Sequence, residues 1–231
     1  MISILIIGNG NVATHLYKAL LNVATVKVLK ISSRNITVVP QADISILAVS
    51  DNAIAAVSSK IINSFVVHTS GSFPMEALQN ETNKGVFYLL QTFSKEKPID
   101  FSKIPICIET TNKENYALLE TLAKTLSKNV CAINSKQRKA LHVAAVFVNN
   151  FTNHLYTIGK DLCKNNQVPF EILQPLIQET AEKIKTLSPE EAQTGPAIRN
   201  DQKTIDSHLA MLNPNQQNIY SILTKSIQNG N

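Results

Sequence analysis

A glycine-rich segment near the start of the chain has the spacing of a dinucleotide-binding loop. It consists of Gly8, Asn9, Gly10, Asn11, Val12 and Ala13. In such a loop the first glycine permits a tight turn, the second lets the backbone approach a pyrophosphate, and the small last residue lets a helix pack close to the sheet. The alternative is a strand-to-helix turn that needs glycine only for its geometry. The apolar run before the loop and the helical pattern after it favour a site for phosphates at a helix N-terminus.

The residues that distinguish NAD from NADP are expected about 20 positions further on, at the end of the second strand. No acid that would bind the ribose of NAD stands there, and the chain reads Ser32, Ser33 and Arg34. Two hydroxyls and a guanidinium suit a 2′-phosphate, so this sequence predicts NADP as the cofactor. The alternative is a solvated arginine on a loop.

The elements that must position this loop alternate between short β-branched runs and helical patterns over the first 130 residues. Strands are expected at residues 2–7, 25–31, 43–49, 65–68, 86–90, 104–108 and 130–133. Helices are expected at residues 11–21, 51–62 and 112–126. This alternation predicts an α/β fold with a Rossmann-type, doubly wound parallel sheet.

The pattern changes after about residue 134, where strand-like runs cease and the apolar residues recur with a helical period. We therefore expect a Rossmann-like domain over residues 1–134 and an all-helical domain over residues 135–231. The first helix of the second part, at about residues 136–164, is unusually long. Ser188 and Asn213 each precede a proline and predict capped helix starts.

Ligands of a doubly wound sheet bind beyond the carboxyl ends of its strands, so the residues that follow each strand are candidates for cofactor contacts. Val49 and Ser50 follow the third strand, and His68, Thr69 and Ser70 end or follow the fourth. We expect His68 to Ser70 to lie near the nicotinamide. For Ser50 the alternative is a helix cap.

Residues of the predicted long helix are further candidates for contacts with a substrate. His142, Ala145, Val146, Asn149 and Asn153 recur at steps of three and four residues, which predicts that they share one face. His142 is the candidate proton donor, because histidine titrates near neutrality. Its alternative is a hydrogen-bonded histidine of the core, and Asn149 contacts either a ligand or another part of the protein.

Arg199 completes the predicted catalytic set with His142 and Asn149. It follows a Gly-Pro break, and its guanidinium suits a substrate carboxylate. The alternative is an ion pair with Asp201 that fixes the loop.

Six segments of the chain together resemble one bacterial family. They are residues 8–16, 68–72, 90–94, 141–145, 149–155 and 195–201. These segments look like the Rossmann-like proteins whose C-terminal half is the domain of unknown function 2520, a family similar to NADP-dependent reductases such as pyrroline-5-carboxylate reductase and to 3-hydroxyacid dehydrogenases. The resemblance covers nearly the whole chain. It implies an NADP-binding domain, a helical domain that usually dimerises, and an oxidoreductase activity without an agreed substrate.

One position departs from the pattern of the similar dehydrogenases. They carry a catalytic lysine one turn before an asparagine, whereas Ala145 precedes Asn149 here. The missing lysine argues against hydroxyacid dehydrogenase chemistry.

The composition excludes several other classes of protein. With 44% hydrophobic and 17% charged residues, the 231-residue chain is that of a globular protein. Its net charge of +5 is scattered, which argues against nucleic acid as a partner. The sequence has neither a long apolar run nor a secretory signal, so we expect a cytoplasmic protein without a membrane partner. Three cysteines without paired spacing predict no metal site.

These observations predict an NADP-dependent oxidoreductase that reduces a small carbonyl or imine compound, with a carboxylate on the substrate if Arg199 binds it. Amphipathic surface beyond what one small helical domain covers predicts a homodimer through the C-terminal helices. The rival hypothesis is an NADP-binding sensor or dimeric scaffold without turnover, which the missing lysine favours. A site for another nucleotide, such as a flavin, is a third hypothesis.

Overall fold

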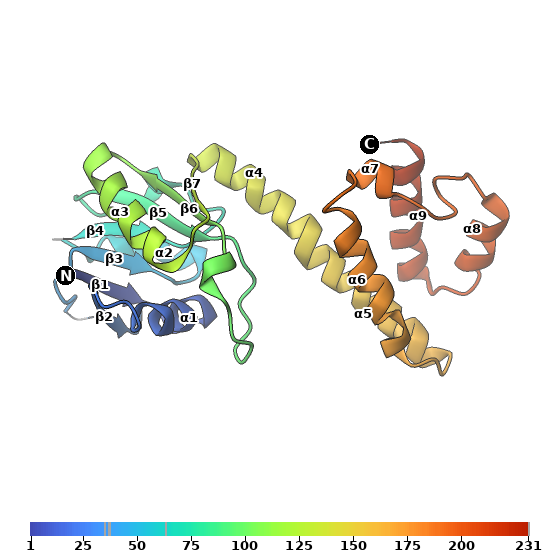
Figure 1. The fold of residues 1–231 in the computed structure, drawn as a ribbon, viewed down its shortest axis with the longest axis horizontal. Coiled ribbons are helices and arrows are strands. Elements are labelled where there is room, and N and C mark those ends of the chain that lie inside the picture. Colours follow the sequence, from blue (N-terminus) through green and yellow to red (C-terminus); the bar gives the residue numbers. More distant parts are fainter. Residues whose placement is uncertain (35, 37, 63, 231) are drawn as a thin grey trace. The chain divides into compact units, whose positions relative to one another are not determined.

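The N-terminal part of the protein is built on a seven-stranded sheet. The computed structural model describes residues 1–34, 36, 38–62 and 64–230, and in these residues the strand order is β2-β1-β3-β4-β5-β6-β7 (Figure 1). The strands are β1 (Ile2–Ile7), β2 (Val26–Ile31), β3 (Ile44–Leu47), β4 (Phe65–His68), β5 (Lys84–Leu89), β6 (Ile106–Thr110) and β7 (Val130–Ala132). The sheet confirms the predicted Rossmann-type α/β fold.

The sheet differs from the prediction in the direction of one strand pair. β5 and β6 pair antiparallel, whereas the other neighbours pair parallel. Parallel neighbours need a crossover connection, which is usually a helix. The chain between β5 and β6 contains only a short 3-10 turn, Phe101–Lys103, so it returns along the same edge and reverses its direction.

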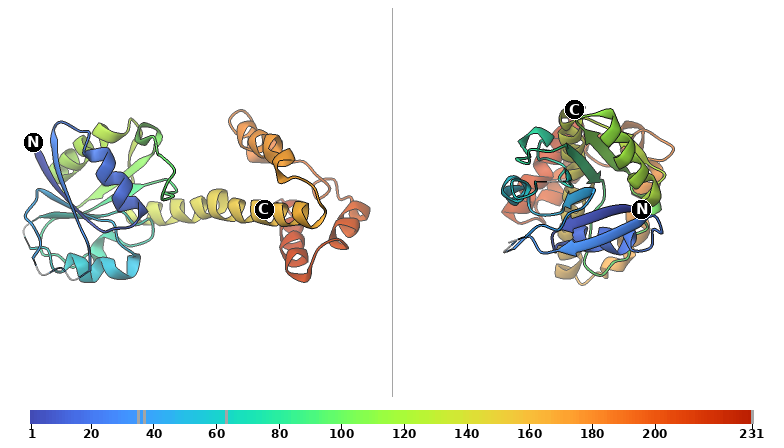
Figure 2. Two further views of the ribbon diagram at one scale, coloured as in Figure 1. Left: turned by 90° about the horizontal axis from the view of Figure 1, so that it is seen from below. Right: turned by 90° about the vertical axis from the view of Figure 1, so that its left-hand side faces the viewer.

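Helices cover both faces of this sheet. Because side chains alternate along a strand, neighbouring residues of β1 face opposite sides. Ile6 packs in the cluster that contains residues of α1 (Asn11–Leu20) and α3 (Lys113–Leu126). Ile7 packs in a second cluster with α2 (Asp51–Ser58). The result is a sheet between two helical layers, which Figure 2 shows from two further directions.

The described residues after β7 are helical or in turns, which confirms the predicted helical C-terminal part. The long helix is continuous, although its middle is a π-helical stretch at Val146–Phe151. The elements are α4 (Ser135–Ala145), the π-helical stretch, α5 (Thr152–Asn165), a 3-10 turn (Phe170–Leu173), α6 (Gln174–Lys183), α7 (Pro189–Ala192), α8 (Gln202–Leu209) and α9 (Pro214–Gln228). None of the helices in the described part of the chain is long and apolar enough to cross a membrane.

The chain divides into two compact units, Met1–Asn149 and Asn150–Asn231. The first unit contains three buried apolar clusters. Among the described residues of the second unit, only Ala197 and Ile205 are buried apolar side chains. Large apolar side chains of this unit are instead exposed, among them Leu155, Ile172, Leu176, Ile184, Ile222 and Leu223. The described part of the second unit therefore has few buried and many exposed large apolar side chains.

Candidate functional site

The predicted dinucleotide loop lies where the strand order reverses, between the ends of β2 and β3. The Gly8 amide donates to the Ile31 carbonyl at 2.9 Å, and the Ala48 amide donates to the Ile7 carbonyl at 2.9 Å. Gly8 has a φ of +144°, and a Cβ atom there would lie 2.1 Å from the Ala48 carbonyl oxygen. Only glycine fits this position, because any side chain would overlap the neighbouring backbone.

The start of α1 leaves space in front of its first amides. Gly10 is the N-cap residue and gives no side-chain cap, and no atom lies within 4 Å of where its Cβ would be. The first intrahelical bond runs from the Thr14 amide to the Gly10 carbonyl at 3.0 Å. The amides of residues 11–13 precede that bond and have no acceptor within the helix, so they form a cradle with the positive end of the helix dipole behind it.

Side chains of α1 contact the main chain of the segment after β5. The Asn11 side-chain amide donates to the Phe93 carbonyl at 2.8 Å, and His15 Nε2 lies 2.8 Å from the Ser94 carbonyl oxygen. The rings of His15 and Phe93 also pack with their centroids 5.7 Å apart. Asn11 therefore offers its backbone amide to the cradle, while its side chain holds a loop.

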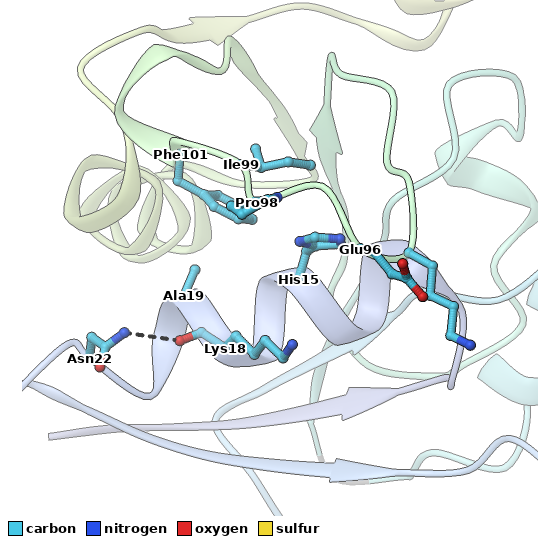
Figure 3. Close-up of a pocket in the computed structure, with 9 residues that line it drawn as sticks. His15, Lys18, Ala19, Asn22, Glu96, Pro98, Ile99 and Phe101 are labelled. Carbon is cyan, nitrogen blue, oxygen red and sulfur yellow. Dashed lines mark hydrogen bonds between the residues drawn. The ribbon is translucent and has the colours of Figure 1, made fainter.

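A pocket of about 510 Å³ opens further along the same helix (Figure 3). Its walls are His15, Lys18, Ala19, Asn22, Lys95, Glu96, Pro98, Ile99 and Phe101. None of the residues predicted to bind the cofactor or substrate lines this pocket.

The residues predicted to select NADP follow β2 directly. The Ser32 hydroxyl accepts a hydrogen bond from the Arg34 amide at 3.2 Å, so it shapes the turn. Ser33 is half-buried and the Arg34 side chain is exposed. The loop therefore presents an unburied guanidinium beside the strand end that Gly8 contacts.

The residues after β3 remain available for a ligand. Val49 is half-buried and Ser50 is exposed. Ser50 is the N-cap residue of α2, but its side chain makes no cap bond. Its carbonyl accepts from the Ala53 amide at 2.9 Å, so the helix start uses the backbone and leaves the hydroxyl unused.

His68 lies inside the protein and organises the loop after β4. Its side chain is fully buried, its Nδ1 accepts from the Ser70 amide at 3.2 Å, and its ring contacts Phe73 edge-on. Burial, with the nearby Arg138 guanidinium, lowers the pKa of His68 to about 3, so the ring is neutral near pH 7. Thr69, whose amide donates to the Leu47 carbonyl at 3.1 Å, and Ser70 are half-buried.

His142 lies beside the same loop. Its Nδ1 atom is 3.2 Å from the hydroxyl of Tyr88 on β5. A Cβ atom on Gly71 would lie 2.5 Å from that nitrogen. His142 is half-buried, so the ring is held on one side by the sheet and the loop.

A buried ion pair fixes α4 against this region. Arg138 is 1% exposed and pairs with the Glu109 carboxylate of β6. Its guanidinium also donates to the Phe73 carbonyl at 2.6 Å. The same carboxylate accepts from the amide and the hydroxyl of Ser135, at 2.8 and 2.9 Å. Arg138 therefore joins β6, the loop after β4 and the first turns of α4, one turn before His142.

Asn149 and Arg199, the other two residues predicted for catalysis, are exposed side chains. Asn149 is exposed within the π-helical stretch. A π-helical turn spans more residues than an α-helical one, so the step from His142 to Asn149 does not return to the same face. Arg199 is exposed and belongs to the second unit.

The alternative role of Arg199, an ion pair with Asp201, is not formed within the described residues. The Asp201 carboxylate instead accepts from the amide and the hydroxyl of Thr204, at 3.1 and 2.8 Å, and caps α8. These two bonds lower the pKa of Asp201. The positive charge of Arg199 also lowers the pKa of Asp201, by less than the bonds from Thr204.

Sequence reasoning missed three residues of the region, namely His15, Tyr88 and Arg138. A charged residue four positions after a helix cap, such as Arg138, has the pattern of a solvated side chain. Tyr88 lies in a run of apolar strand residues, a pattern typical of side chains in the core. The spacing of Asn11 and His15, four residues apart on one helix face, was a signal that two polar groups share a partner.

Comparison with known proteins supplies the family. The model of the domain of unknown function 2520 matches residues 104–227. A Bacteroides fragilis protein provisionally named an NADP oxidoreductase is 38% identical, with 99% of this chain and 98% of that chain covered and a TM-score of 0.87. No functionally curated protein matches the chain.

Two more distant structures share the fold. The first is 1-pyrroline-5-carboxylate reductase from Streptococcus pyogenes, at 14% identity, 99% and 98% coverage of this and that chain and a TM-score of 0.63. The second is an imine reductase from Myxococcus stipitatus in complex with NADP+, at 14% identity, 98% and 92% coverage and a TM-score of 0.63. The family match and the close relative together show that this chain belongs to the family defined by the domain of unknown function 2520.

Proposed function

We propose that the protein is an NADP-dependent oxidoreductase that reduces a small carbonyl or imine compound. The observation that carries the proposal is the loop at the end of β1, where Gly8 is pressed against the Ala48 carbonyl and the first amides of α1 face open space. The 38% identical relative, which is named an NADP oxidoreductase and matches over nearly its whole length, supports the same cofactor.

The loop fits the diphosphate of a dinucleotide. The space beside Gly10 is empty within 4 Å, which leaves room for a phosphate against the amides of residues 11–13. Ser32, Ser33 and Arg34 would hold a 2′-phosphate, and Val49, Ser50, Thr69 and Ser70 lie at the strand ends where the nicotinamide half is expected. NADPH, when bound, supplies the hydride.

The protein's own groups supply the rest of the reaction. His142 would give a proton to the oxygen or nitrogen atom of the reduced double bond. Arg199 would bind a substrate carboxylate and Asn149 would contact the substrate. Replacing Arg199 by alanine should then raise KM for substrates that carry a carboxylate and leave KM for uncharged substrates unchanged.

The proposed assembly is a homodimer through the C-terminal helices. The second unit buries only Ala197 and Ile205 among its described apolar side chains, so it lacks the core that an independent domain needs. A second copy of the same helices would cover the exposed faces of α5, α6 and α9. Light scattering of the full chain tests the assembly, and a monomer at micromolar concentration would contradict it.

The cofactor is tested with Gly10→Ala. A Cβ atom at Gly10 meets no protein atom within 4 Å, so the variant should fold normally and still weaken NADPH, because the methyl group occupies the space of the diphosphate. Calorimetric titration with NADPH and NADH measures the effect. Unchanged NADPH affinity in this variant, or no binding to the unmodified protein, would refute the proposed site.

Turnover is tested by NADPH oxidation with a panel of cyclic imines, keto acids and aldehydes. Oxidation with one class identifies the substrate. Tight NADPH binding without oxidation over the whole panel would favour the rival function, a cofactor-binding protein without turnover.

A further inference from the structure

The Tyr88 hydroxyl lies within hydrogen-bond distance of Nδ1 of His142. Tyr88 is 8% exposed, and among the described residues His142 Nδ1 is the one hydrogen-bond partner of its hydroxyl. A buried hydroxyl has one hydrogen and needs an acceptor. Nδ1 of His142 supplies that acceptor when the ring is neutral with its hydrogen on Nε2.

The electrostatic surroundings keep the proton on Tyr88. Burial, followed by the nearby Cys107 thiol, raises the pKa of the Tyr88 hydroxyl, and the positive charge of Arg138 offsets this only in part. A neutral imidazole that accepts at Nδ1 carries its hydrogen on Nε2. The bond thus selects one of the two tautomers of His142.

Gly71, on the loop after β4, lies against the rings of both His142 and Tyr88. A Cβ atom there would lie 2.5 Å from Nδ1 of His142 and 3.0 Å from Cζ of Tyr88. Gly71 does not have a φ in the left-handed region, so its backbone conformation does not require glycine. The reason for glycine at this position is space for the two rings.

The loop that carries Gly71 is held on both sides of it. The Ser70 hydroxyl accepts from the amides of Ser72 and Phe73 at 3.1 and 3.0 Å. The Phe73 carbonyl accepts from Arg138 at 2.6 Å. Gly71 therefore cannot retreat freely from the imidazole, and the ring is confined between the loop and Tyr88.

We propose that Tyr88 and Gly71 are positioning residues that hold His142 in the Nε2–H tautomer, so that the ring offers a hydrogen-bond donor on the side away from Tyr88. The inference rests on the proposed role of His142 in the reduction. A hydroxyl that donates to Nδ1 leaves the hydrogen of the neutral ring on Nε2, whereas a carboxylate would accept from Nδ1–H and favour the other tautomer.

The direct test is the tautomer of His142, which nitrogen NMR of ¹⁵N-histidine-labelled protein reports, at a pH above the usual titration range of imidazole. His142→Gln identifies the signals of this ring by their loss. The unmodified protein should show a hydrogen on Nε2 and none on Nδ1. In Tyr88→Phe, which keeps the ring and loses the hydroxyl, the two tautomers should become mixed. A hydrogen on Nδ1 in the unmodified protein, or an unchanged tautomer in Tyr88→Phe, would overturn the proposal.

The molecule contains a matched control. His208 Nδ1 lies 2.9 Å from the hydroxyl of Tyr220 in the second unit. Tyr220→Phe removes the same kind of bond, and it should change the signals of His208 and leave those of His142 and the rate of NADPH oxidation as they are.

Activity gives a second readout. Tyr88→Phe and Gly71→Ala should lower kcat on the order of tenfold to a hundredfold, because a misplaced catalytic group is less effective, while NADPH affinity stays the same. Loss of NADPH affinity together with kcat would show a general structural role and contradict the proposal. If the unmodified protein reduces no compound, the proposed function fails, and the NMR measurement still decides the tautomer.

Discussion

The loop after β1 and the region around His142 are built from different parts of the chain. The loop presents main-chain amides at the start of α1, and Gly8 and Gly10 leave space by having no side chain. The region around His142 depends on side chains from β5, β6 and α4 that bond to one another. A backbone site is sensitive to added volume, whereas a side-chain site is sensitive to lost partners. Substitutions should therefore disrupt the loop after β1 by adding atoms, and the region around His142 by removing a hydrogen-bond or ion-pair partner.

The largest effect is expected in the side-chain region, for Arg138→Met. This change leaves the Glu109 carboxylate, which is 12% exposed, without its ion-pair partner. Breaking a buried ion pair from one side destabilises a protein by about 3 to 5 kcal/mol. Urea denaturation measures the free energy of unfolding. The double variant Arg138→Met, Glu109→Gln should be more stable than Arg138→Met alone, and a loss below about 1 kcal/mol in the single variant would contradict the role given to this pair.

The matching change in the backbone region is Gly8→Ala. The new Cβ would lie 2.1 Å from the Ala48 carbonyl oxygen at a φ of +144°, so we expect a loss of about 3 to 4 kcal/mol in unfolding free energy. Gly195→Ala is the control, because Gly195 has a φ of +109° and nothing lies within 4 Å of its Cβ position. Gly195→Ala should therefore lose only the free energy of the backbone strain, about 1 to 3 kcal/mol. Equal losses in the two variants would show that the contact with Ala48 is not tight.

The difference between the loop after β1 and the region around His142 explains which features could be predicted from the sequence. The loop at Gly8 and the helix starts at Ser188 and Asn213 depend on residues close together in the chain. The structure has a strand-to-helix turn at the first, and at both helix starts it has reciprocal capping bonds. Such local features are encoded in short segments.

The contacts around His142 are not local. Tyr88 and His142 are 54 residues apart in the chain, and Arg138 and Glu109 are 29 residues apart. Whether they meet depends on the direction of β6, which the sequence pattern did not reveal because the short 3-10 turn before it does not resemble a crossover helix. The residues predicted for catalysis were therefore chosen by type and by helical spacing, and neither pattern shows that His142 lies beside Tyr88.

A smaller effect, again in the side-chain region, concerns the stability of the protein at acid pH. The pKa of His68 is lowered from 6.5 to about 3 by burial and by Arg138. Below pH 6.5 the unfolded chain binds a proton at this histidine that the folded protein does not bind, so the stability falls with decreasing pH down to about pH 3. Between pH 7 and pH 5 this histidine alone should remove about 2 kcal/mol.

His68→Asn is the comparison for this pH dependence, because the asparagine oxygen can accept from the Ser70 amide in place of Nδ1. Chemical denaturation of both proteins at the two pH values should show the smaller change in the variant. The same pH dependence in both would mean that His68 is not the group that titrates on unfolding.

An effect of similar size is expected in the proposed cofactor region, for the side chain of Arg34. In the proposed site, the amides of α1 would treat NADPH and NADH alike, because both carry the same diphosphate. In the proposed site, the exposed guanidinium of Arg34 would contact the 2′-phosphate, which only NADPH carries. Since a hydrogen bond to a charged group contributes about 1.5 to 3 kcal/mol, Arg34→Ala should weaken NADPH by about tenfold to a hundredfold and leave NADH almost unchanged. Calorimetric titration with both nucleotides measures the ratio, and Lys30→Ala, whose side chain lies over the Tyr17 ring, is the control for losing a nearby positive charge. If both nucleotides weaken equally in Arg34→Ala, the arginine acts on the fold of the loop and the choice of NADP must come from elsewhere.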